Sequence, residues 1–205
     1  MPLSRLFRAL PAIFSAFVIA SCSDSGVSGP PAVDDLSSVA APLLPPPLTG
    51  EPVDATGLEL KALWWDRDHK NVRVSSTIGP AGGTISVPET GLTMSFPAGA
   101  VTAPITITIT ADEEYVAYKM EPSGTTFLKD VTVTQALSKT ELGDRLLKRP
   151  LYAAYIADDR VSLKGKIPIL ELEPSQTIFS PLNALLPVAH VWIIRHFSRY
   201  MLSSG

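Results

Sequence analysis

A chain of 205 residues, 45% of them hydrophobic, is long enough for one folded domain with a tail. Its formal net charge is −3 and no basic patch is interleaved with aromatic residues, which argues against nucleic acid as a partner. The single cysteine excludes an intramolecular disulfide, a four-cysteine metal site and a dithiol redox motif.

Residues 1–22 are predicted to be a secretory signal peptide, because Arg5 and Arg8 precede a short apolar stretch. A membrane-spanning helix needs about 20 apolar residues, more than this stretch supplies. The stretch ends in Ile-Ala-Ser-Cys, which resembles the lipobox of bacterial lipoproteins, so we expect Cys22 to carry a lipid. The alternative is an ordinary signal peptide cleaved after Ala20, which leaves Cys22 as an unmodified thiol.

Residues 23–70 are expected to be a disordered tether that leads into a transition segment. Serine, glycine, alanine and proline dominate its first part, and such a composition cannot bury enough apolar surface to order itself. The proline run at 45–47 stiffens the tether towards extended geometry. We therefore expect this segment to hold the following domain away from a membrane.

Two tryptophans in the transition segment, Trp64 and Trp65, leave two interpretations open. They form a binding patch that stacks on a ligand, or they are a hydrophobic latch that packs on the domain. The nearby Asp66, Asp68 and His69 are metal ligands by type, but no further partner is close to them in the sequence. We therefore expect a solvated loop there and no metal site.

Residues 71–205 are predicted to form an all-β fold, an antiparallel β-sandwich. Short segments with period-two alternation, separated by proline-glycine turns and without a strong helix, are typical of this class. The expected strands are 72–77, 84–87, 92–96, 105–110, 115–120, 131–134, 151–156 and 167–172. We expect a loop-rich segment at 174–187 and a closing apolar stretch at 188–202.

Three segments within residues 72–135 carry a family resemblance: IGPAGGTISVPETGLTMSFPAGAV, PITITIT and PSGTTFLKDVTVTQ. Together they resemble the ZU-five domain of zonula occludens proteins, ankyrins and netrin receptors. The sequence RHFSRY at 195–200 is similar to a strand motif of the same family. The resemblance implies an antiparallel β-sandwich used for protein-protein contact and scaffolding.

The resemblance also implies a possible chemistry, because some relatives cut themselves between the Phe and the Ser of a His-Phe-Ser motif. Carried over, Ser198 attacks the carbonyl of Phe197, and water hydrolyses the resulting ester. His196 orients or deprotonates the serine. The alternative is structural, with Phe197 in the core and His196 and Ser198 on the polar face of a final strand.

The sequence therefore predicts a non-enzymatic protein of the bacterial cell envelope, anchored by the lipid on Cys22, at the outer membrane. It requires no cofactor and contacts an envelope protein or a polymer. Self-processing at Phe197-Ser198 is the alternative function, and a purely structural envelope component is a third.

Overall fold

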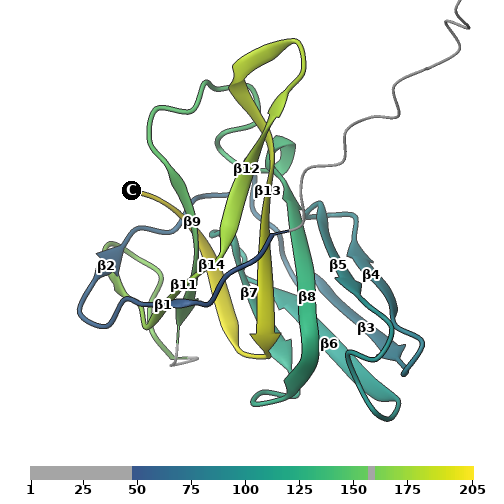
Figure 1. The fold of residues 1–205 in the computed structure, drawn as a ribbon. Helices are drawn as coiled ribbons and strands as arrows, with labels where there is room; N and C mark the ends of the chain where they lie inside the picture. The colour runs from purple at the N-terminus through teal and green to yellow at the C-terminus, as the bar shows by residue number, and fades with distance from the viewer. Residues whose placement is uncertain (1–47, 157–159) are drawn as a thin grey trace, which may run out of the picture. The chain divides into compact units, whose positions relative to one another are not determined.

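The computed structural model describes residues 48–156 and 160–205, and the expected signal peptide, Cys22 and the tether before residue 48 lie outside them. The described residues form two large antiparallel sheets with a common core and a third sheet of two short strands, which confirms the predicted all-β sandwich (Figure 1). Within this part of the chain, no helix combines the length and the apolar character needed to cross a bilayer.

The first sheet has seven strands in the order β1-β11-β9-β14-β7-β6-β3. Its strands are β1 (Val53–Asp54), β3 (Arg73–Ile78), β6 (Ile105–Ala111), β7 (Ala117–Glu121), β9 (Leu151–Ile156), β11 (Glu171–Glu173) and β14 (Arg199–Ser204). The second sheet has five strands in the order β12-β13-β8-β5-β4. Its strands are β4 (Gly83–Val87), β5 (Leu92–Phe96), β8 (Thr126–Ala136), β12 (Ser175–Ser180) and β13 (Asn183–His196).

The alternating strand β6 shows how the sequence pattern produces the core. Ile107 and Ile109 are fully buried between the sheets, because successive side chains of a strand point to opposite faces. On the outer face, Thr108 pairs with Ser75 of β3 through a hydroxyl-hydroxyl hydrogen bond of 2.8 Å. The ITITIT segment therefore pairs as its period predicts, with isoleucine inward and threonine outward.

A second, smaller core covers the outer face of the first sheet at β7, β9 and β14. Ala154 and Met201 are buried there beneath residues that precede β3, among them Ala55 and Ala62. The short strands β2 (Glu59–Leu60) and β10 (Ile167–Pro168) pair with each other and close this layer. The packed part therefore includes the segment from 53 to 70, which precedes the domain boundary expected at residue 71.

Several expected elements differ from the observed ones. The segment 174–187, predicted to be loop-rich, instead contains β12 and the start of β13. The closing stretch 188–202 is divided between two strands that belong to different sheets, β13 and β14. The strand expected at 167–172 is divided between β10 and β11, and the one helical turn among the described residues is the short 3-10 helix Leu137–Lys139.

Candidate functional site

The bend between β13 and β14 carries the chain from the five-stranded to the seven-stranded sheet, and the His-Phe-Ser motif forms it. Phe197 is buried against Phe96 and Phe127, with ring centroids at 6.4 and 4.7 Å. Its backbone N–H donates to the Thr125 carbonyl at 2.7 Å, and its carbonyl accepts from Gly124 N–H at 3.0 Å. The middle residue of the motif is therefore a core anchor that fixes the bend.

The two polar residues of the motif are not joined to each other. Within the described part of the chain, no hydrogen bond links His196 to the Ser198 hydroxyl, and the imidazole contacts Tyr200 instead. The Tyr200 hydroxyl donates to the His196 carbonyl at 2.8 Å and lies 3.2 Å from Nδ1 of the same residue. This arrangement fits the structural interpretation of the motif better than it fits a serine activated by His196.

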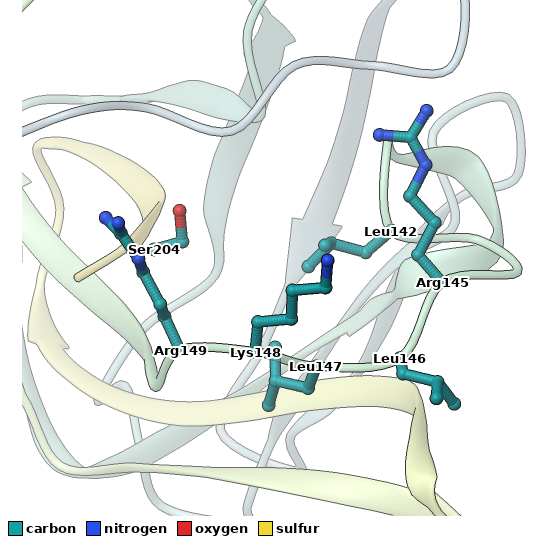
Figure 2. Close-up of a pocket in the computed structure, with 7 residues that line it drawn as sticks. All are labelled: Leu142, Arg145, Leu146, Leu147, Lys148, Arg149 and Ser204. Carbon is teal, nitrogen blue, oxygen red and sulfur yellow. The ribbon is translucent and has the colours of Figure 1, made fainter.

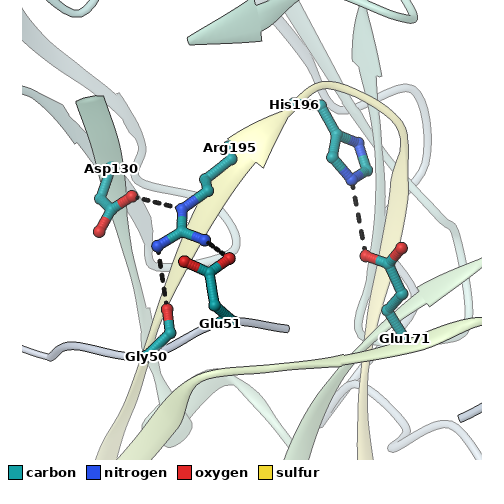
Figure 3. Close-up of polar contacts among 6 residues, drawn as sticks. All are labelled: Gly50, Glu51, Asp130, Glu171, Arg195 and His196. Carbon is teal, nitrogen blue, oxygen red and sulfur yellow. Dashed lines mark hydrogen bonds and ion pairs between the residues drawn. The ribbon is translucent and has the colours of Figure 1, made fainter. Parts of the chain in front are cut away.

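The same imidazole faces two carboxylates from β11, which lies between β1 and β9 in the seven-stranded sheet. His196 Nε2 lies 3.8 Å from Glu171 Oε2, and one ligand atom from each of Glu171, Glu173 and His196 lies within 4.8 Å of the others. Figure 3 shows Arg195 and His196, which are neighbours on β13, diverging from the strand. Arg195 contacts Asp130, Glu51 and Gly50, whereas His196 faces Glu171.

The strand register explains why these groups meet. Tyr155 on β9 lies opposite Glu171 on one side and Tyr200 on the other, so all three side chains project from one face of the sheet. The Tyr155 ring packs on His196 with centroids 5.0 Å apart. Glu173 is two residues after Glu171 and therefore points to the same inner face.

Glu173 is the most unusual member of this group. Its side chain is 5% exposed, and neither of its carboxylate oxygens has a hydrogen-bond partner among the described residues. Burial, with a smaller contribution from the charge of Glu171, raises the pKa of Glu173 to about 8. A buried carboxyl group without a hydrogen-bond partner lowers the stability of the fold, and buried polar groups in proteins nearly always have such a partner. Glu173 is an exception to this rule.

The two candidate tryptophans occupy different environments. Trp65 is buried, and its indole N–H donates to the Asp112 carbonyl at 2.9 Å. Trp64 is half exposed and its ring lies 4.6 Å from that of Tyr115. The structure therefore does not place the pair in one surface patch: Trp65 belongs to the core, and only Trp64 has an open face.

An apolar and basic surface lies at the opposite end of β13 from the His-Phe-Ser bend. The loop 142–149 encloses a hollow of about 440 Å³ with Ser204, and its lining includes three leucines and the cations Arg145, Lys148 and Arg149 (Figure 2). Backbone N–H of Leu147 donates to the Leu185 carbonyl at 3.0 Å, which ties this loop to the β12–β13 hairpin. At the tip of that hairpin, Leu182 is 95% exposed.

Comparison with known proteins gives no independent assignment. A scan against protein-family models found no match for the chain. A search of curated proteins also found no match.

The sequence singled out the His-Phe-Ser motif but placed it on a final strand, and it predicted neither the bend between β13 and β14 nor the partners on β11. Glu171 and Glu173 come together with His196 only through the pairing of β11 with β9 and of β9 with β14. A Glu-x-Glu pair on a strand indicates that both side chains share a face, but not which face or what lies opposite. No local pattern in the sequence indicates the contact between the loop 142–149 and the β12–β13 hairpin, because it joins segments far apart in the chain.

Proposed function

We propose that this chain is a non-enzymatic, lipid-anchored protein of the bacterial cell envelope, at the outer membrane, whose sandwich presents an interaction surface to a partner protein. The lipid on Cys22 anchors it, and the tether holds the domain away from the membrane. The ZU-five resemblance supports a role in protein-protein contact. The His-Phe-Ser bend, with His196 turned towards Tyr200 and Glu171, favours an uncut chain over self-processing.

The observation that carries the proposal is the combined surface of the loop 142–149 and the tip of the β12–β13 hairpin, which we call the leucine-basic surface. Leu146, Leu182 and Leu185 expose apolar side chains there. Such leucines cost free energy in water unless a partner covers them, and exposed apolar groups rimmed by polar residues mark interaction sites.

Charge decides which partner chemistry this surface fits. Three basic side chains stand against one acidic residue, Asp144, within the loop 142–149. We therefore assign the partner as an envelope protein that inserts an apolar side chain between carboxylates. Charge complementarity of this kind speeds association and sets specificity, while the leucines supply the buried apolar core of the contact.

The test is site-specific photocrosslinking in the cells that make the full-length protein. A photoreactive residue at Leu182 is compared with one at Leu128, which is 71% exposed at the start of β8, near the other end of the sandwich. The proposal predicts one defined protein adduct from position 182 and none from position 128. It also predicts loss of that adduct when Arg145, Lys148 and Arg149 are changed to glutamate.

Three results would reject this assignment. Equal adducts from both positions would mean nonspecific collision. Adducts with lipid alone would mean that the surface contacts the membrane. The absence of any adduct from position 182 would leave the protein as a structural component without a partner at this surface.

A further inference from the structure

We propose that Glu171, Glu173 and His196 bind a divalent transition-metal ion, Zn²⁺ by the chemistry of its ligands, and that this ion joins the two sheets of the sandwich. The sequence predicted no metal site because Glu171 and Glu173 are 25 and 23 residues away from His196. The inference concerns the opposite end of β13 from the leucine-basic surface and does not depend on the proposed function.

The three side chains form a donor set that suits zinc. One imidazole nitrogen and two carboxylates are ligands that Zn²⁺ accepts in proteins, with three protein ligands and an open fourth position in many sites. An imidazole in the set favours a transition metal over Ca²⁺ or Mg²⁺, which prefer oxygen ligands throughout. The group from β11 and β13 therefore has the composition of a three-ligand zinc site.

The burial of the Glu173 carboxylate points to a cation independently of the grouping of the three residues. Glu173 is only 5% exposed, and both of its carboxylate oxygens lack a hydrogen-bond partner among the described residues. Its ligand atom lies within 4.8 Å of those of Glu171 and His196, so the carboxylate faces the same point as the other two. A cation at this point supplies the partner that the buried oxygens require.

Tyr200 orients the imidazole of His196. The single proton of the Tyr200 hydroxyl is donated to the His196 carbonyl, so the hydroxyl oxygen accepts from Nδ1–H of the same histidine. That tautomer leaves the lone pair on Nε2, the nitrogen that faces Glu171. Metal-binding histidines are commonly oriented by a hydrogen bond to the second ring nitrogen, and Tyr200 occupies that place as a positioning residue.

The group is open to solvent on one side, and its spacing is close to that of zinc ligands. Glu171 and His196 are partly exposed while Glu173 lies at the base, so an ion can enter from solvent. Ligands of a tetrahedral zinc site lie about 3.4 Å apart, because each sits about 2.1 Å from the metal. The Nε2 to Oε2 distance of 3.8 Å is close to this value, and the ligand atom of Glu173 lies within 4.8 Å of the other two.

The consequence is structural. Glu171 and Glu173 belong to β11 of the seven-stranded sheet, and His196 ends β13 of the five-stranded sheet. An ion held by all three links β11 to the bend at Phe197. Because the ion binds the folded chain and not the unfolded one, it stabilises the fold by mass action.

The test uses the full-length protein after treatment with a chelator and dialysis. Isothermal titration with ZnCl₂ is expected to show one bound equivalent, and 100-fold excess over the dissociation constant is expected to raise the melting temperature by about 5 to 10 °C. Co²⁺ in place of Zn²⁺ is expected to give the visible absorption of a four- or five-coordinate site. CaCl₂ and MgCl₂ serve as hard-cation probes and are expected to give no shift.

Variants separate the site from surface binding. Glu173→Gln and His196→Gln are expected to lower zinc affinity about 100-fold, which reduces the thermal shift at the same zinc concentration to about 1 °C. Tyr200→Phe, which keeps all three ligands, is expected to lower affinity about 10-fold. The matched control is His69→Gln, which removes a histidine that lies near Asp66 and Asp68 in the sequence. This variant is expected to bind Zn²⁺ with the same affinity as the unaltered protein. Far-UV circular dichroism establishes that each variant is folded, and Glu171→Gln is a second ligand variant if Glu173→Gln does not fold.

The proposal is overturned if the unaltered protein binds no Zn²⁺ under these conditions. It is equally overturned if the ligand variants bind with unchanged affinity, or if His69→Gln removes the binding. A thermal shift of the same size with Ca²⁺ would show that the imidazole is not a ligand.

Discussion

Trp64 and Trp65 are adjacent in the sequence, and the structure assigns Trp65 to the core and Trp64 to the surface. Replacing each of them by alanine tests this assignment. Trp65 is 5% exposed and contacts the rings of His69 and Tyr118 at centroid distances of 5.0 and 5.8 Å. Its removal leaves a large cavity and an unpaired Asp112 carbonyl. Replacement of a buried tryptophan by alanine costs about 3 to 5 kcal/mol of unfolding free energy.

Trp64 is the matched control, because it is 50% exposed and its main ring contact is Tyr115. Loss of one such aromatic pair costs about 0.5 to 1.5 kcal/mol. For a chain of this size about 1 kcal/mol lowers the melting temperature by about 2 to 4 °C. Trp65→Ala is therefore expected to lower it by about 10 °C, and Trp64→Ala by no more than about 5 °C.

The assay is thermal unfolding of the full-length protein, followed by far-UV circular dichroism so that the loss of a fluorophore does not affect the signal. A third variant, Trp65→Phe, keeps most of the ring volume but removes the indole N–H that reaches Asp112. We expect it to cost about 1 to 2 kcal/mol, between the two alanine variants. Equal shifts for the two alanine variants, or a larger shift for Trp64→Ala, would refute the assignment.

Two further predictions concern buried groups and turns. Burial lowers the pKa of His190 to about 4, so the unfolded chain takes up a proton at this residue first as the pH falls. The contribution of His190 to the free energy of unfolding is fully present above pH 6.5 and declines by about 3 kcal/mol towards pH 4. Urea unfolding of His190→Asn should therefore show a flatter dependence on pH across that window. Gly82 and Gly165 both have positive φ, so replacement by alanine strains the backbone at either position. A Cβ at Gly82 also clashes with the Phe96 carbonyl oxygen, whereas nothing lies within 4 Å of a Cβ at Gly165, so Gly82→Ala should be much less stable than Gly165→Ala. Equal midpoints for the two glycine variants, or a His190→Asn profile as steep as that of the unaltered chain, would contradict these assignments.

The sequence predicted the strands that bury one face and present the other to solvent. Ile107 and Ile109 of β6, and Met94 of β5, alternate with polar residues, so the period fixes both the strand and its inner face. The prediction failed at the β12–β13 hairpin, whose tip extends beyond the core (Figure 1). Leu182 and Leu185 are exposed there, and a ribbon without a buried face carries no alternation to detect.

The candidate sites show the same distinction between local and long-range information. The His-Phe-Ser motif is contiguous, so its residues could be selected before their contacts were known. The grouping of His196 with Glu171 and Glu173 depends on strand pairing across the seven-stranded sheet and on the approach of the two sheets. Sequence spacing does not encode such a contact, which forms only when the whole sandwich is assembled.

The most direct test of the central claim, an uncut and lipid-anchored protein, is a denaturing intact mass of the protein purified from a bacterial membrane fraction. The account predicts a mass that corresponds to lipid-modified Cys22 through Gly205, with no separate peptide 198–205. A mass without lipid would contradict the anchor. A chain that ends at Phe197, recovered together with the peptide that begins at Ser198, would contradict the non-enzymatic assignment and establish self-processing in its place.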